Sequence, residues 1–276
     1  MFNSHFKELL IKSSFLFEFS LKFVYNQNTM EIIDSHAHLN FQAFDGDREE
    51  AIKRSLDHKI QMINVGSQYE TSKKAIEIAR EGVYASVGLH PIHSEDGFDT
   101  DLYRKLTQSD KVVAIGETGL DNYNRPKSKT KREEFLAKQT DIFEKQLDLA
   151  QELDLPVIVH CRSAHGKVLE ILKKRSLRGV IHCFTGTWQD ATEYLNLGFY
   201  IGFNGIIFKL DLEETIKKTP IDRILVETDC PYLTPPQREG RNEPIYIIDV
   251  IERLEELRGE DLREVTTKNT KNLFKL

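Results

Sequence analysis

The sequence has few cysteines and no excess of positive charge. Its three cysteines, Cys161, Cys183 and Cys230, show neither paired nor CxxC spacing. Such a set argues against a disulfide framework and a structural zinc knuckle, and it favours a reducing, cytoplasmic compartment. The 38 basic and 44 acidic residues give a net charge of −6, so no global positive field attracts a nucleic acid backbone. Any contact with nucleic acid must therefore be local.

Long apolar runs and the common nucleophile and nucleotide-binding signatures are also absent. No run approaches the roughly 20 apolar residues that span a bilayer, so we expect no integral membrane protein. The chain has no serine nucleophile elbow, no Walker loop and no dinucleotide fingerprint. With 39% hydrophobic residues over 276 positions, the chain can still bury a substantial single core.

Residues 1–29 differ from the rest of the chain. Six phenylalanines are mixed there with lysine and glutamate, and neither a helical nor a strand period persists. Glu18 and Lys22 interrupt the apolar stretch that a signal peptide needs, and the segment has none of the arginines of a mitochondrial presequence. We interpret residues 1–29 as a poorly ordered or non-native extension, with Met30 as the natural start.

Eight short apolar runs follow, each succeeded by a stretch with helical spacing. Near-continuous runs of valine and isoleucine are typical of buried parallel strands, and here they occupy 32–33, 62–65, 84–87, 112–115, 157–159, 180–181, 199–201 and 224–226. The amphipathic segments between them include 48–58, 71–80, 131–153, 167–175 and 212–218.

This alternation predicts an α/β fold of the (β/α)8 TIM-barrel type. Eight βα units in the 247 residues from Met30 to Leu276 match the size of that barrel, about 250 residues. An open doubly wound sheet is the alternative, but it would normally carry a glycine-rich phosphate turn after its first strand. We therefore predict one hydrolase domain over residues 30–276.

Candidate metal ligands stand at the predicted strand ends, where the chemistry of a parallel barrel is found. The spacing of His36 and His38 points both imidazoles toward the barrel axis. A lone histidine on a strand is more often a core or surface residue, but six donors at strand ends together favour metal binding. They suffice for two divalent ions, with Glu117 as the bridging candidate: His36, His38, Glu117, His160, His182 and Asp229.

The remaining histidines and the cysteines are weaker candidates. His90 follows the third predicted strand and could support a ligand or face substrate. His5 lies in the extension, and we expect His58, His93 and His165 on the solvated surface. Each cysteine directly follows a predicted ligand, so strand alternation should point the thiols away from the metal site as small buried hydrophobes.

With these residues in view, the chain from Met30 onward resembles the TatD family of metal-dependent hydrolases and deoxyribonucleases. The resemblance is carried by IDSHAHL (33–39), GLHP (88–91), IGETGLD (115–121), VHCR (159–162), HCFTG (182–186), VETDCPYLTP (226–235) and GRNEP (240–244). It implies that the six residues above occupy the family's metal-ligand positions. Two departures, Asn122-Tyr123-Asn124 and Ser163, remove no ligand but bear on substrate preference.

The resemblance favours a metal-dependent, exonuclease-like deoxyribonuclease, a hydrolase acting on ester bonds of single-stranded or end-accessible DNA. Two divalent ions would activate a water, and Asp229 would accept its proton. Arg162 and Arg241 are candidate phosphate contacts, although Arg241 could instead form a structural ion pair with a carboxylate such as Glu227. The basic run 125–132 would either follow a nucleic acid backbone or form a solvated helix start.

Two other functions remain open from the sequence. The same activated water could attack a carbonyl, as in a D-aminoacyl-tRNA deacylase, because the site specifies the nucleophile and not the electrophile. A non-enzymatic binding barrel is disfavoured by the intact ligand set. Four imidazoles suit Zn²⁺ or Mn²⁺, while the resemblance includes Mg²⁺, so metal identity stays undecided.

Overall fold

The computed structural model describes residues 30–123 and 125–276, and the predicted extension 1–29 lies outside them. Its eight strands are all parallel and are joined in chain order. They are β1 (Ile32–Ala37), β2 (Ile60–Val65), β3 (Val83–Val87), β4 (Val112–Asp121), β5 (Val157–Arg162), β6 (Gly179–His182), β7 (Tyr200–Phe203) and β8 (Ile224–Val226).

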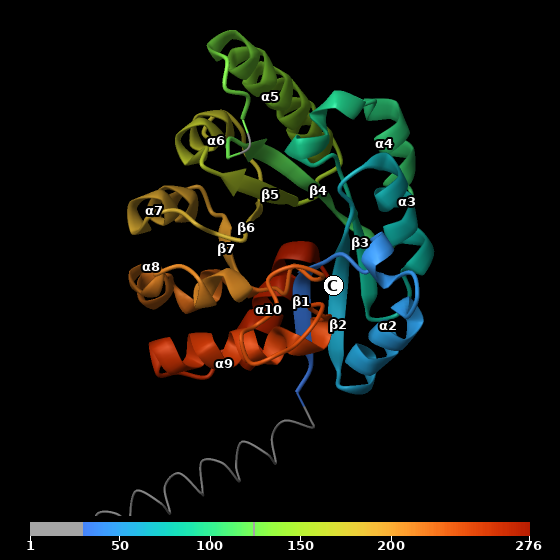
Figure 1. Ribbon diagram of the computed structural model, residues 1–276, viewed down its shortest axis with the longest axis vertical. Coiled ribbons are helices and arrows are strands. Elements are labelled where there is room, and N and C mark those ends of the chain that lie inside the picture. Colours follow the sequence, from blue (N-terminus) through green and yellow to red (C-terminus); the bar gives the residue numbers. More distant parts are fainter. Residues whose placement is uncertain (1–29, 124) are drawn as a thin grey trace, which may run out of the picture.

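Helices alternate with these strands around the outside of the sheet (Figure 1). They are α2 (Arg48–Asp57), α3 (Tyr69–Ile78), α4 (Thr100–Leu106), α5 (Lys129–Glu152), α6 (His165–Leu172), α7 (Trp188–Asn196), α8 (Glu213–Lys218), α9 (Ile247–Arg258) and α10 (Arg263–Phe274). The TIM-barrel prediction is confirmed, and each predicted strand overlaps an observed one.

The sheet curves round so that its first and last strands meet. Ser35 Oγ of β1 donates a hydrogen bond to the carbonyl of Val226 in β8, at 2.9 Å. Beyond the end of β8, the Asp229 N–H donates to the His36 carbonyl at 2.8 Å. The barrel is thus joined at the level where the predicted ligands lie, which brings residues from the two ends of the domain together.

Two apolar layers stabilise this arrangement. Inside the barrel, Ile63, Ile158 and Leu225 pack with Leu273 and Phe274 of α10. Outside it, the helices pack on the sheet in a larger cluster. Burial of apolar surface at about 25 cal/mol per Å² makes these layers the main source of stability. Within the described residues, no helix is long and apolar enough to cross a membrane.

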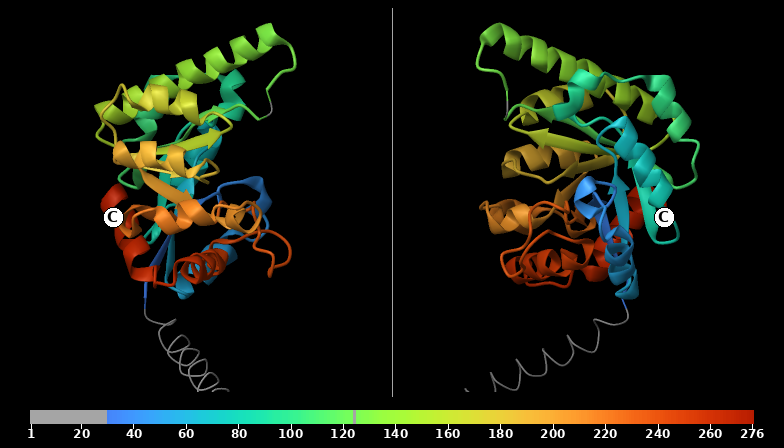
Figure 2. Two further views of the ribbon diagram at one scale, coloured as in Figure 1. Left: turned by 90° about the vertical axis from the view of Figure 1, so that its left-hand side faces the viewer. Right: turned by 45° about the vertical axis from the view of Figure 1, so that its right-hand side comes forward.

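The connection from β4 to α5 stands out from the barrel. In Figure 2 the start of α5 and the segment leading to it reach beyond the tips of the strands, on the side where the strands end. α5 begins at Lys129, two residues before the expected boundary, so the second half of the basic run 125–132 is helical. This face of the molecule also carries the predicted metal ligands.

Candidate metal centre

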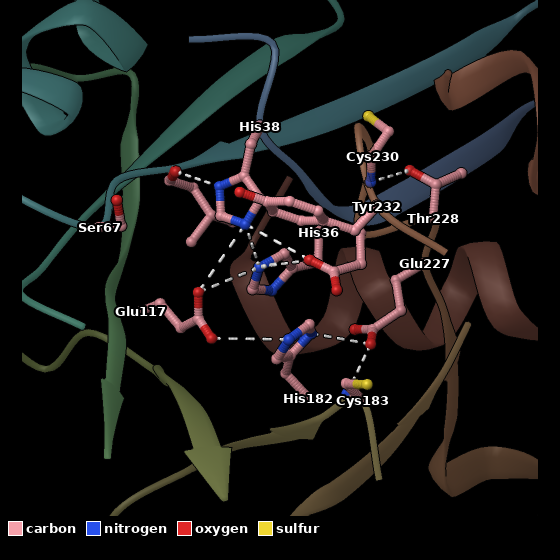
Figure 3. Close-up of polar contacts among 12 residues, drawn as sticks. His36, His38, Ser67, Glu117, His182, Cys183, Glu227, Thr228, Cys230 and Tyr232 are labelled. Carbon is pink, nitrogen blue, oxygen red and sulfur yellow. Dashed lines mark hydrogen bonds and ion pairs between the residues drawn. The ribbon is translucent and has the colours of Figure 1, made fainter. Parts of the chain in front are cut away.

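The predicted ligands converge at the mouth of the barrel, where Figure 3 shows four of them, His36, His38, Glu117 and His182. His36 lies in β1 and His38 follows it, Glu117 lies within β4, His160 within β5 and His182 at the end of β6. Asp229 follows β8 by three residues. β4 runs on to Asp121, beyond the predicted end at Glu117. Strands far apart in sequence thus bring all six side chains to one place.

One group of donors surrounds the junction of β1 and β8, and we call His36, His38 and Asp229 the closure cluster. The Nε2 atoms of the two histidines are 3.1 Å apart. Asp229 Oδ1 lies 3.8 Å from His36 Nε2 and 3.4 Å from His38 Nε2. Glu117 Oε2 lies 3.5 Å from His36 Nε2 and 3.8 Å from His38 Nε2.

The other carboxylate oxygen of Glu117 faces a second group. Its Oε1 lies 2.9 Å from His160 Nδ1 and 3.3 Å from His90 Nε2, and we call His90 and His160 the rim cluster. His182 Nε2 is 3.6 Å from the same oxygen, and its ring stacks on His36 with centroids 3.6 Å apart. His90, which the sequence ranked below the six ligands, is therefore as close to Glu117 as they are.

The chemistry and spacing of these donors fit divalent cations. Four coordinated ligands at the usual 2.0–2.1 Å Zn–N distance stand about 3.3 Å from one another. The donor atoms around Glu117 are 2.9 to 3.8 Å apart, in two overlapping groups. Nitrogen and carboxylate oxygen donors suit Zn²⁺ and Mn²⁺, and a carboxylate can bridge two ions. The arrangement can hold one or two ions.

Three of the candidate histidines have a polar contact on the far side of the ring, a hydrogen bond for His38 and His160 and an ion pair for His182. His38 Nδ1 donates to the Val65 carbonyl at 2.8 Å, which turns the lone pair of Nε2 toward the site. His182 Nδ1 lies 2.9 Å from Glu227 Oε1, and His160 Nε2 lies 3.2 Å from Asp121 Oδ2. Such outer contacts select the tautomer and raise ligand basicity.

The sequence did not reveal the roles of Asp121 and Glu227. Asp121 lies four residues after Glu117 on the same strand. Because side chains at even spacing point to the same face, this spacing could have predicted that Asp121 lies near the site. Glu227 lies beyond the end of β8, where alternation no longer applies. It is fully buried and also accepts hydrogen bonds from the Cys183 N–H at 2.7 Å and from Asn204 at 3.1 Å.

Burial and charge set the protonation of these groups. Burial disfavours the charged form of His182, but the negative charges of Glu227 and Glu117 outweigh it and raise its pKa to about 10. Burial and the positive charge of His182 lower the pKa of His36 to about 4. Burial alone would raise the pKa of Glu117, but the charges of His90 and His182 hold it well below its usual range. The carboxylate that faces both groups is therefore ionised.

Asp34, two residues before His36, joins the two ends of the barrel. Its carboxylate accepts hydrogen bonds from the Thr228 N–H at 2.9 Å, from Thr228 Oγ1 at 2.5 Å and from the His36 N–H at 3.2 Å. Asp34 is completely buried, and burial raises its pKa to about 8. These contacts hold β1 and the segment after β8 in register, and so position His36 relative to Asp229.

The expectation that all three cysteines point away from the ligands is wrong for Cys183. Its Sγ lies within 4.8 Å of donor atoms of both His182 and Asp229. β6 ends at His182, and Cys183 has a φ of +45°, so strand alternation does not extend to it. Burial raises its pKa well above the usual value, which keeps the sulfur as a thiol. Cys161 and Cys230 are buried, as expected.

Of the weaker histidines, His58 is exposed as predicted, whereas His93 and His165 are half-buried. His165 Nδ1 lies 3.2 Å from both Cys161 Sγ and the Tyr194 hydroxyl, in the layer between barrel and helices. The amphipathic pattern of α6 suggested an exposed position, but His165 is the first residue of that helix, where the chain still lies close to β5.

The two candidate arginines have different surroundings. Arg241 makes a bidentate ion pair with Asp47, with distances of 2.8 and 2.7 Å, and contacts Glu243 at 3.0 Å. These partners take the place of Glu227, the carboxylate considered from the sequence. Arg162 is exposed, and its guanidinium carbon lies 3.8 Å from the centre of the Tyr123 ring.

Comparison with known proteins identifies the family of this chain. A family model described as TatD related DNase matches residues 33–276. The chain belongs to the TatD family. Among TatD-family relatives, the uncharacterized metal-dependent hydrolase YabD of Bacillus subtilis is 40% identical over 260 residues, covering 89% of this chain and 99% of that protein. The 3'-5' ssDNA/RNA exonuclease TatD of Cronobacter sakazakii is 37% identical over 266 residues, covering 88% and 97%.

A solved TatD-family structure has the same architecture. YjjV of Escherichia coli, a TatD homolog, superposes with a TM-score of 0.80 at 30% identity, covering 89% of this chain and 98% of that one. A TatD-family hydrolase of Entamoeba histolytica superposes with a TM-score of 0.78 at 25% identity, covering 89% and 98%. The predicted family and the predicted class of metal-dependent hydrolase are therefore confirmed.

Proposed function

We propose that this protein is a two-metal-ion phosphodiesterase that removes nucleotides from an exposed end of single-stranded nucleic acid. One observation carries the proposal: the two oxygens of Glu117 face separate groups of histidines. A carboxylate so placed supports two ions side by side. In the proposed centre, His36, His38 and Asp229 hold one ion, and His160 and His182 hold the other, with His90 beside it.

Bound divalent ions would supply a water of lowered pKa and would neutralise charge on a phosphodiester. Within the protein, Asp229 is the group suited to accept the proton of that water, at Oδ2. Burial opposes ionisation of Asp229, but its contact with His38 and the charge of His182 keep its pKa below the usual value. The carboxylate is therefore available as a base at neutral pH.

We propose Arg162, rather than Arg241, as the arginine that meets a substrate phosphate. Arg162 is exposed beside the rim cluster, whereas Asp47 and Glu243 already engage the guanidinium of Arg241. The names of relatives such as the Cronobacter exonuclease support nucleic acid as the substrate class. Three cysteines without disulfide partners support a cytoplasmic location.

The test is hydrolysis by the purified full-length protein, stripped of metal and reloaded separately with Mg²⁺, Mn²⁺ or Zn²⁺. The substrates are end-labelled single-stranded DNA and a D-aminoacyl-tRNA, with Asp229→Ala as the blank. We expect metal-dependent shortening of the DNA that is lost in the blank, and the product ladder gives its direction. Deacylation of the tRNA with intact DNA would reject the proposal in favour of a carbonyl hydrolase.

A further inference from the structure

We propose that the segment after β4 forms a second binding surface, outside the metal centre, for the body of a single nucleic acid strand. We call it the strand surface: Tyr123, with Arg162 stacked on it, and the basic residues of 125–132. The proposal deepens the nuclease function proposed above and rests on it. It assigns Tyr123 as a base-stacking platform and the basic run as contacts to the phosphates that follow.

Tyr123 is connected to the candidate metal centre through Asp121. Its N–H donates a hydrogen bond to Asp121 Oδ1 at 2.9 Å, and Asp121 Oδ2 contacts His160 Nε2 at 3.2 Å. One carboxylate therefore separates the tyrosine from the rim cluster. The residue is nevertheless 63% exposed, so its side chain is open to a ligand.

Arg162 covers one face of the Tyr123 ring. The guanidinium carbon lies 3.8 Å from the ring centroid, and the Asn122 N–H donates to the Arg162 carbonyl at 2.9 Å, which holds the two strand ends together. A cation over one face rigidifies the ring, and its exposure leaves area for a base. Stacking of bases on aromatic rings tolerates any sequence, because every base has a π-face.

The basic run continues from this platform beyond the barrel. Between Asn122 and Arg132 the sequence has five basic residues and no acidic residue, although the protein's net charge is −6. Within the described residues, Arg125, Lys127, Lys131 and Arg132 make no ion pair, and Lys129 has a single long contact, 3.9 Å from Glu133. Figure 2 shows this segment projecting past the strand tips.

Another arginine-containing loop on the same face differs. In the connection after β8, Arg238 contacts Asp249 at 2.8 Å and Arg241 contacts Asp47 at 2.7 Å, so both charges are neutralised locally. The arginines of that loop are thus paired, whereas in the part of the chain that the structure describes the only ion pair among the basic residues of 125–132 is the long contact of Lys129. An aromatic platform followed by free cations is the combination that binds single strands, whereas a duplex keeps its base faces stacked and hidden.

The test compares binding of a labelled single-stranded oligonucleotide by fluorescence anisotropy, in the metal-loaded Asp229→Asn background so that the strand stays intact. We expect Lys127→Glu/Lys131→Glu to weaken binding at least about tenfold and to reduce the salt slope by roughly 0.7 for each phosphate that the protein no longer neutralises. The matched control is Lys105→Glu/Lys268→Glu. It makes the same charge change at two exposed lysines remote in sequence from the strand surface, and we expect little effect.

Tyr123→Ala separates stacking from charge. We expect it to weaken single-strand binding about tenfold and to reduce the preference for a single strand over a duplex of the same sequence, with the salt slope unchanged. In the hydrolytically competent protein, the rise in KM should shrink as the strand is shortened from about twelve nucleotides to two.

Equal loss of affinity in the Lys127/Lys131 and Lys105/Lys268 variants would overturn the proposal, because the effect would then be net charge alone. Binding of anionic lipid vesicles through Lys127 and Lys131, with single-strand affinity unaltered, would also overturn it and assign the surface to a membrane. These binding results are independent of catalysis. Absence of DNA hydrolysis by the unmutated protein would instead contradict the nuclease function itself.

Discussion

The two halves of the candidate metal centre are held in different ways. The closure cluster lies at the junction of β1 and β8, where backbone hydrogen bonds join Asp229 to His36 and His38 to Cys230, at 2.8 and 2.9 Å. Its histidines are buried, and its Asp229 side chain is 15% exposed. The rim cluster is about as buried, with the His160 side chain 16% exposed, but His160 is held by side-chain contacts to Glu117 and Asp121.

This difference indicates which of the candidate ligands are fixed by the fold. Those that also close the barrel are positioned by the backbone, and moving them would disturb the junction of the sheet. Ligands at the rim are positioned by carboxylates and lie beside Tyr123 and Arg162. We therefore expect substrate to approach past the rim cluster. The closure cluster should keep its position during the reaction.

Glu117→Ala should have the largest effect, because the carboxylate of Glu117 contacts both the closure cluster and the rim cluster. We expect activity to fall at least about a thousandfold, since metal-assisted stabilisation is worth several kcal/mol. Circular dichroism should remain that of a folded barrel. His58→Ala, at an exposed site, is the matched histidine control and should retain activity. Unchanged activity in Glu117→Ala would refute the assigned centre.

Glu227→Gln tests the support beneath His182. Because outer carboxylates tune metal ligands, we expect a loss of metal affinity of roughly 10- to 100-fold, measured by isothermal titration calorimetry with Mn²⁺. Gly202→Ala should act in the same direction, since an added Cβ would lie 2.7 Å from Glu227 Oε2. If Glu227→Gln binds metal as tightly as the unmutated protein, His182 needs no such support.

Metal affinity should also depend on pH. With a pKa of about 10, His182 carries a proton at neutral pH, and an ion must displace that proton to bind. The apparent affinity for Mn²⁺ should therefore rise with pH, by up to about tenfold per pH unit for each proton displaced. Calorimetry in buffers of different ionisation enthalpy counts the released protons, and a pH-independent affinity would exclude a protonated His182.

Substitutions of Arg162 and Arg241 should have the smallest effects, and they distinguish a substrate contact from a structural ion pair. Arg162→Ala, beside the rim cluster, should raise KM for a DNA strand roughly tenfold while stability is retained. Arg241→Ala should instead lower the free energy of unfolding by about 1 kcal/mol, because it removes the ion pairs with Asp47 and Glu243. Urea denaturation and steady-state kinetics measure both quantities, and the reverse pattern would exchange the two roles.

The fold could be predicted because each strand contains a short apolar run rich in valine, isoleucine or other strand-forming residues. The observed β5, Val157–Arg162, extends the run at 157–159, and β8, Ile224–Val226, coincides with the predicted run. The C-terminal end of β4 and the start of α5 could not be located, because strand length depends on pairing partners. β4 continues to Asp121 since it pairs with β5 as far as Arg162.

The site could be predicted only as a set of residues at strand ends. Contacts between residues far apart in the chain could not be predicted from the sequence. The ion pair of Arg241 with Asp47, for example, joins residues 194 positions apart. The position of Cys183 was mispredicted because a left-handed residue interrupts strand alternation there. The proximity of His90 to Glu117 depends on the course of the loop after β3, where the His90 N–H donates to the Ser67 carbonyl at 2.9 Å.

By itself, the sequence determined the barrel, the family and which side chains gather at its mouth, because apolar periodicity, the order of parallel strands and the motifs at their ends specify all three. Only the tertiary structure decided which atoms face one another. The curvature that joins β1 to β8 and the course of the chain beyond each strand turn one oxygen of Glu117 to the closure cluster and the other to the rim cluster. Spacing along a chain carries no information about separations of a few ångströms between strands.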